Sequence, residues 1–302
     1  MGIVDRVMGA LARRFAAESV ERARSDARWS PALKVGLRHL WLYYADRASR
    51  GAAIGDASAA GFRIFSQFEE DGITLALLAS LGDGPRLFVD IGAGDGVFAS
   101  NCANLAINLG FHGLFIDGNA VLVERGRAVY ADHPDTSLYP PVFVNAKVTP
   151  ATVNDVIASA GFTGEIDFLS IDIDGNDYWV WEALTVVEPR VVLIETHPEL
   201  GHRSLVAPYV DDPGRVPGRP SHFLGASPAA MTALATRRGY RLVAANRFGF
   251  NLFYVREELA TTTIPAIRPD DVFRHPRAKT RVLPDSALAG LPFIEPSRAE
   301  RR

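Results

Sequence analysis

The sequence has very little cysteine, and this scarcity excludes two kinds of structural support. Cys102 is the single cysteine among 302 residues, which rules out an intrachain disulfide and a cysteine-based zinc site. Long apolar runs are also absent, so no membrane-spanning helix is predicted. The start of the chain has no basic leader followed by an unbroken apolar core, and Arg6 stands where a myristoylation signal needs serine or threonine. These absences predict a cytoplasmic protein.

An excess of charge of either sign is missing too. The chain has 32 Lys and Arg against 35 Asp and Glu, a net charge of −3, with an isoelectric point near 6.2. Nucleic acid is therefore not an expected partner. Hydrophobic residues make up 48 % of the sequence, which is typical of a globular protein with a sizeable core.

The two ends of the chain differ from its middle. Residues 1–60 are expected to form an N-terminal helical extension, because apolar residues recur at helical spacing with arginines between them. This locally basic segment has two interpretations: contact with a membrane surface or partner, or packing on its own core or across a homo-oligomer. Residues 259–302 are rich in proline and arginine, and we expect a C-terminal tail over the surface.

Residues 61–258 alternate β and α patterns, which is typical of a parallel sheet with helices on both faces. Five strands are predicted, at residues 87–91, 113–117, 142–148, 166–173 and 191–195. Two more, 240–245 and 251–256, are joined only by a short turn around Gly249, so they must form an antiparallel hairpin. The predicted fold is therefore α/β and Rossmann-like, with five parallel strands closed by a C-terminal hairpin.

The first predicted strand runs into a glycine loop, FVDIGAGDG, at residues 88–96. Ligands of open α/β sheets bind beyond the carboxyl ends of the strands. The loop is not a dinucleotide fingerprint, because Val97 stands where the third glycine is needed, and it lacks the Gly-Lys-Ser/Thr of a P-loop. Asp90 and Asp95 would repel a pyrophosphate. S-adenosylmethionine fits better, since it carries an ammonium and a sulfonium and no phosphate.

A third acid supports a nucleoside site. Asp117 ends the second predicted strand about 20 residues after the loop, the spacing at which a carboxylate accepts hydrogen bonds from ribose hydroxyls. The alternative is that Asp90 and Asp117 only cap strand ends around a tight turn. The acids on both sides of the loop, together with the hairpin, favour a nucleoside with a positively charged tail.

Several segments resemble one group of enzymes. They are SQFEEDGI (66–73), FVDIGAGDG, GLFIDGN, DFLSIDIDGNDYWVW, VVLIETH and the stretch 225–256. Together they resemble class I S-adenosylmethionine-dependent methyltransferases, and more narrowly the FkbM-type group, whose members methylate hydroxyls on natural products and glycans. The resemblance covers residues 61–258 and is stronger in the cofactor half. The cofactor contacts that it implies are Asp90, Gly92, Ala93, Gly94, Asp117, Gly118, Asn145, Ala146, Gln67, Asp71 and Asp172.

The reacting groups are expected after the fourth and fifth strands, in SIDIDGND (170–177) and IETHPELGH (194–202). A hydroxyl acceptor must lose a proton, either to a base or through a metal-lowered pKa. Three interpretations stay open. In the first, Asp172, Glu195 and Asp174 or Asp177 bind Mg²⁺. In the second, His197 is the general base without a metal, and Asp172 matters in both. In the third, the acids only form a turn that caps a helix.

Residues 201–221 contain prolines and glycines without periodicity, a pattern typical of a lid or binding loop. We expect this loop to recognise the acceptor, with Arg203, Tyr209 and His222 as contacts. The predicted function is S-adenosylmethionine-dependent O-methylation of a small-molecule natural product or a saccharide. Two alternatives are a nucleotide-dependent oxidoreductase and a non-catalytic scaffold built on the same domain.

Overall fold

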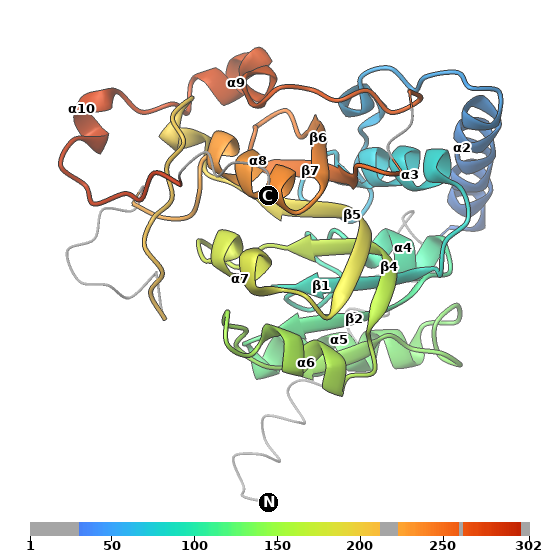
Figure 1. Cartoon of the computed structure of the whole chain (residues 1–302). Coiled ribbons are helices and arrows are strands. Elements are labelled where there is room, and N and C mark those ends of the chain that lie inside the picture. Colours follow the sequence, from blue (N-terminus) through green and yellow to red (C-terminus); the bar gives the residue numbers. More distant parts are fainter. Residues whose placement is uncertain (1–29, 212–222, 260–261, 297–302) are drawn as a thin grey trace, which may run out of the picture.

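A seven-stranded sheet runs through the centre of the computed structural model, which describes residues 30–211, 223–259 and 262–296 (Figure 1). The strand order is β3-β2-β1-β4-β5-β7-β6. Strands β1 to β5 are parallel, and β7 runs antiparallel to both β5 and β6. The predicted α/β fold of five parallel strands and a terminal hairpin is confirmed. The strands are β1 (Leu87–Ile91), β2 (His112–Asp117), β3 (Val142–Asn145), β4 (Gly164–Ile171), β5 (Val187–Glu195), β6 (Tyr240–Ala245) and β7 (Asn251–Arg256).

Five strand boundaries differ from the predicted ones. Strands β2 and β4 begin slightly earlier than expected, at His112 and Gly164. Strands β3 and β4 end at Asn145 and Ile171, earlier than expected, because the chain turns there to line a cleft. Strand β5 begins at Val187 rather than at residue 191. Pro189, a residue type that is uncommon inside sheets, pairs in register with Ile166 of β4.

Helices cover both faces of the sheet. One face carries α3 (Glu70–Leu81), α4 (Ala103–Asn108) and α5 (Ala120–Asp132), and the other carries α6 (Val153–Ser159), α7 (Asp177–Ala183) and α8 (Pro228–Arg237). Strand side chains alternate between the two cores. Phe88 of β1 packs in the core that includes α3, whereas its neighbour Val89 packs in the core that includes α7.

Part of the expected N-terminal extension is a helix, α2 (Pro31–Ser49), which lies beside α3 (Figure 1). Its Leu37 is buried against the domain, whereas Val35, Leu42 and Tyr43 are exposed. Residues 1–29 lie outside the described residues. In the described part of the chain, no helix combines the length and apolarity needed to cross a membrane. Binding of this extension to a membrane, a partner or a second copy stays a prediction.

The C-terminal segment differs from the surface tail expected. It contains the 3-10 helix η5 (Pro269–Arg274), α9 (Pro276–Lys279) and α10 (Asp285–Leu288). Val272, Phe273 and Ala278 are buried in the same core as α8. Ile294 exchanges two backbone hydrogen bonds of 2.8 Å with Val206. The irregular spacing of these apolar residues, among prolines and arginines, explains why periodicity did not predict their burial.

A buried ion pair fixes the edge of the sheet opposite the carboxyl ends of the strands. Nη1 of Arg190 lies 2.7 Å from Oδ1 of Asp167, and both side chains are buried. Arg190 also donates to the carbonyl oxygens of Leu81 and Gly82, where α3 ends. Oδ2 of Asp167 accepts from the backbone N–H of Arg86, just before β1. The pair therefore joins α3, β1, β4 and β5.

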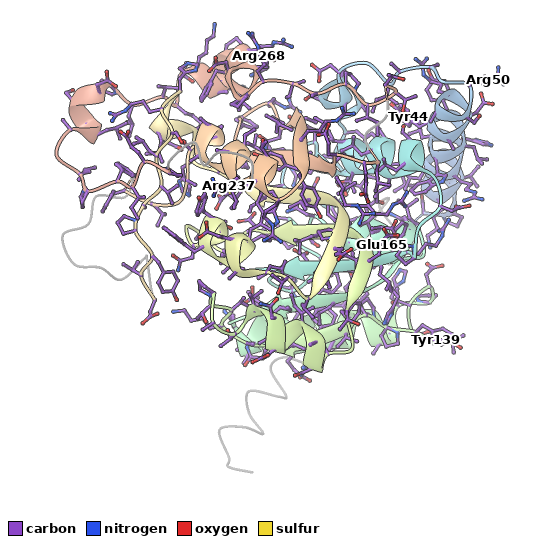
Figure 2. The ribbon with its side chains drawn as sticks, in the orientation of Figure 1. Tyr44, Arg50, Tyr139, Glu165, Arg237 and Arg268 are labelled. Carbon is purple, nitrogen blue, oxygen red and sulfur yellow. The ribbon has the colours of Figure 1, made fainter. Side chains whose placement is uncertain are left out.

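We predict that Arg190→Met lowers the free energy of unfolding by about 3–5 kcal/mol, because it leaves a buried carboxylate without its cation. Glu165→Ala is the matched control, since Glu165 (labelled in Figure 2) lies on β4, the strand of Asp167, but pairs with Arg256 near the surface. The control should lose about 1 kcal/mol or less. Urea denaturation measures both values, and equal small losses would contradict the role given to Arg190.

Candidate active site

A cleft of about 380 Å³ opens at the carboxyl ends of β1, β2, β3 and β4. The strand order puts the switch point of the sheet between β1 and β4, where open α/β sheets bind ligands. Five of the residues proposed as cofactor contacts line this cleft: Gly92, Asp117, Gly118, Ala146 and Asp172.

The glycine loop approaches its neighbours more closely than a side chain would allow. Gly92 has a φ of +87°, and a Cβ on it would lie 1.7 Å from the carbonyl oxygen of Asp172. The loops after β1 and β4 therefore touch through backbone atoms. Gly94, at φ +59°, donates its N–H to Oδ2 of Asp117 at 2.8 Å. The predicted loop thus depends on glycine at both positions.

Asp117 is held in place by the backbone around it. Its Oδ1 accepts from the N–H of Asn119 at 2.7 Å, in addition to the bond from Gly94. The Asn145 side chain donates to the carbonyl oxygen of Asp117 at 2.9 Å. Asn145 therefore supports the end of β2, whereas its neighbour Ala146 lines the cleft.

Asp90, at the end of β1, is only 2 % exposed. Burial raises its pKa to about 7, and the negative charge of Asp117 adds to the rise, while hydrogen bonds from Ser170 and Cys102 oppose it. Its Oδ2 has no hydrogen-bond partner in the described part of the chain. Ala93, two residues beyond the strand end, is buried and donates its N–H to Ile116.

Two acids of the region that resembles a cofactor site, Asp95 and Asp71, bond to neighbouring residues of the fold. Asp95, counted in the sequence among the charges that favour a cation, accepts from the N–H groups of Val97 and Phe98 and pairs with Arg125 at 3.3 Å. Asp95 therefore caps its own loop, and its expected influence on ligand charge is weakened.

Asp71 holds the segment before α3. Its Oδ2 accepts from the backbone N–H groups of Ile64, Phe65 and Ser66 and from the Ser66 hydroxyl, at 2.7–2.9 Å. Burial still raises its pKa to about 6. Gln67, the other residue implied in this segment, is exposed and does not line the cleft.

Three carboxylates gather after β4 and β5. Oxygens of Asp172, Asp174 and Glu195 all lie within 4.8 Å of one another. Burial raises the pKa of Asp172 to about 8, and repulsion from Asp177 and Asp174 adds to it. Burial, followed by the charge of Asp172, also raises the pKa of Glu195 well above its usual range. A set of carboxylate oxygens at these distances fits a hard divalent cation such as Mg²⁺.

Asp177 does not belong to this set. Its Oδ1 accepts from the N–H of Ile173 and its Oδ2 from the N–H of Gly175, both at 2.9 Å. These bonds hold the turn before α7, and Asp174 within it has a φ of +55°. Of the two alternative ligands considered in the sequence, the geometry favours Asp174.

His197 lies after β5 but does not line the cleft. Its ring packs on Gly225, where a Cβ would lie 2.0 Å from Cδ2 of the imidazole. Burial lowers its pKa, against the opposing effect of Glu199 and Asp174. Its Nε2 has no partner among the described residues. Burial therefore favours the neutral form of the imidazole.

The described part of the predicted acceptor loop is anchored beside α7. Nε1 of Trp179 donates to the carbonyl oxygen of Ala207, and Nδ2 of Asn176 donates to that of Val210. The Tyr209 hydroxyl bonds to Asp211, which lines the cleft. Arg203 instead pairs with Glu295, and His222 lies outside the described residues.

Sequence reasoning missed several residues at the cleft. Asn176, Asp211 and Lys147 line it. Asn176 lies within the SIDIDGND segment and Asp211 within the predicted acceptor loop, but neither was named as a contact. Lys147 directly follows Ala146, a proposed cofactor contact, so its position in the sequence next to Ala146 was the signal that could have identified it. Tyr178 and Trp181, which follow the turn, are buried in the core.

We predict that Asp90→Asn stabilises the ligand-free protein, and more so as pH rises. A carboxyl with a folded pKa near 7 and an unfolded pKa near 4 loses stability as pH increases between those values, because the folded state resists ionisation. The melting temperature of the variant should exceed that of the wild type by about 5 °C at pH 8 and by much less at pH 4. A difference that does not change with pH would contradict the burial of an ionisable Asp90.

Comparison with known proteins adds little to this geometry. No protein-family model and no curated protein matches the chain. Among solved structures, an O-methyltransferase family protein from Burkholderia thailandensis is similar, with 13 % sequence identity and a TM-score of 0.35. The match covers 74 % of this chain and 70 % of that one. A likeness this distant carries no argument about activity, so the fold assignment rests on the strand order itself.

Proposed function

We propose that this chain is an S-adenosylmethionine-dependent methyltransferase that acts on a hydroxyl of a small molecule or saccharide. The observation that supports this most is the cleft itself, which Gly92 and Asp117 line, with Asp117 bonded to the glycine loop. The carboxyl of Asp90 is buried behind this lining. Such a site favours a nucleoside with a positive tail over one with phosphates. The FkbM-type resemblance supports oxygen as the methylated atom.

Two acids have the chemistry to hold the cofactor. Both oxygens of Asp117 already accept one backbone hydrogen bond, and a carboxylate has capacity for about four, so ribose hydroxyls can be added. Asp90 has an unpartnered buried oxygen, which suits the ammonium group. S-adenosylmethionine supplies an electrophilic methyl group when bound. The protein's task is then to orient the acceptor and take up its proton.

Asp172 is the residue we propose to receive that proton, because it lines the cleft. Burial raises its pKa, and a positive charge bound beside it would favour the ionised form, which can accept a proton. His197 is the alternative base, since its neutral imidazole has a free Nε2. It is less favoured because its ring packs on Gly225 and outside the cleft.

Mg²⁺ is the second cofactor that the residues fit. Asp172, Asp174 and Glu195 would hold it, and Oε2 of Glu195 has no other partner in the described residues. When bound, Mg²⁺ lowers the pKa of the acceptor hydroxyl. Proton uptake by Asp172 or His197 does not require it, so the two routes are separable by experiment.

We predict that S-adenosylhomocysteine binds and that NAD does not, as measured by isothermal titration calorimetry. Asp117→Ala should weaken adenosylhomocysteine binding by about tenfold or more, because it removes the acceptor for the ribose hydroxyls. Asp155→Ala, an exposed acid on α6, is the matched control and should leave affinity unchanged. Tight NAD binding would favour the oxidoreductase, and no binding of either compound would favour the non-catalytic scaffold.

We also predict that MgCl₂ raises the melting temperature of the adenosylhomocysteine complex and that EDTA reverses the rise. Glu195→Gln should remove the effect, because one charged ligand of the carboxylate set is lost. Glu165→Gln, which changes a surface carboxylate on β4, is the control. If Mg²⁺ has no effect on the wild type, proton transfer to Asp172 or His197 alone remains.

A further inference from the structure

Three oxygen-bearing side chains lie in a row across the carboxyl edge of the sheet. Asp172 follows β4, Glu195 ends β5 and Asn251 begins β7. Glu195 and Asn251 are directly opposite each other in the antiparallel register. Asp172 comes next after the Ile171–Ile194 pair of β4 and β5. We call Asp172, Glu195 and Asn251 the oxygen row.

A buried glutamate fixes the orientation of Asn251. Nδ2 of Asn251 donates to Oε1 of Glu70 at 3.0 Å, and Nδ2 of Asn246 donates to the same oxygen at 2.8 Å. Oε2 of Glu70 accepts from the N–H of Phe68 at 2.8 Å. An ionised carboxylate only accepts hydrogen bonds. Glu70 therefore takes the NH₂ end of the Asn251 amide and leaves the oxygen end for the row.

The side-chain amide oxygen of Asn251 is buried without a hydrogen-bond partner among the described residues. Its side chain is 1 % exposed, and Oδ1 has no hydrogen-bond partner within the described residues. The same is true of Oε2 of Glu195, opposite it. Buried polar atoms without partners cost free energy and call for an explanation. The amide oxygen of Asn251 is an acceptor, as the Glu195 carboxylate is in its ionised form, and Asp172 continues the row at the cleft.

We propose that the oxygen row orients the methyl acceptor, with Glu70 and Asn251 as positioning residues. A molecule lying along it must bring hydrogen-bond donors beside the methylated oxygen, from either hydroxyl or ammonium groups. A carboxylate or phosphate at that place is repelled. The inference rests on the proposed function, because it is Asp172 that brings the row beside the cofactor cleft.

The test uses three compounds built on a quaternary carbon with hydroxymethyl groups. Tris carries an ammonium, pentaerythritol a further hydroxymethyl group, and dimethylolpropionate a carboxylate. Binding to the protein saturated with S-adenosylhomocysteine is followed by saturation-transfer NMR. Tris, pentaerythritol or both should bind saturably, and dimethylolpropionate at least about tenfold more weakly. The comparison of Tris with pentaerythritol separates ammonium from hydroxyl. Equal binding of the carboxylate, or no binding of any compound, overturns the inference.

Glu70→Gln tests the positioning role. The introduced amide keeps the bond from the Phe68 N–H only if its oxygen faces Phe68 and its NH₂ faces Asn251. The Asn251 amide must then turn its oxygen toward position 70 and its NH₂ toward Glu195. Affinity for the preferred compound should fall about tenfold or more, while adenosylhomocysteine affinity stays the same. Glu124→Gln, on the surface of α5, should change neither value.

If Glu70→Gln does not fold, Asn251→Ala serves instead, because it removes the oxygen and leaves Asn246 to pair with Glu70. It should weaken the same compound to a similar extent. Unchanged compound affinity in a folded variant contradicts the positioning role and leaves the proposed function intact. Failure of the wild type to bind adenosylhomocysteine contradicts the proposed function, and the inference with it.

Discussion

Burial of like charges at one edge of the sheet is the constraint on which the site depends. Parallel strands end at the same edge, so Asp90, Asp172 and Glu195 converge there. Burial raises the pKa of each carboxyl, and the neighbouring acids raise it further. Among the ion pairs of the described residues, none involves these three side chains. Such an arrangement is unfavourable for the empty protein and becomes favourable when a positively charged ligand is bound.

At the opposite edge of the same sheet, a buried carboxylate is neutralised by an ion pair. Asp167 is as deeply buried as Asp90, yet Arg190 neutralises it and backbone N–H groups bond its second oxygen. That acid is committed to the fold, with no oxygen left for a ligand. The contrast supports the proposal that the unpartnered acids at the cleft edge bind a ligand, because the chain satisfies a buried carboxylate where only structure is needed.

The sequence predicted the strands well and the roles of individual acids poorly. The alternating β and α patterns gave the five parallel strands, and the short turn at Gly249 forced the hairpin. The roles of individual acids were harder to predict, because aspartates in a loop look alike in sequence. Asp71, Asp95 and Asp177 accept bonds from nearby backbone N–H groups, whereas Asp90 keeps a buried oxygen without a partner. Only the folded path of the loops decides which acid caps a turn.

The first turn of α3 connects the two halves of the candidate site. Two adjacent acids at its start, Glu70 and Asp71, bond to different parts of the chain. Asp71 accepts hydrogen bonds from the segment before the helix, and Glu70 accepts them from Asn246 and Asn251 at the hairpin. Carboxylates at a helix N-terminus are favoured by its dipole. A shift of this one turn would therefore move the amide of Asn251 together with the loop that precedes the helix. The start of α3 therefore links the segment that precedes it, residues 64–66, to the hairpin residues Asn246 and Asn251.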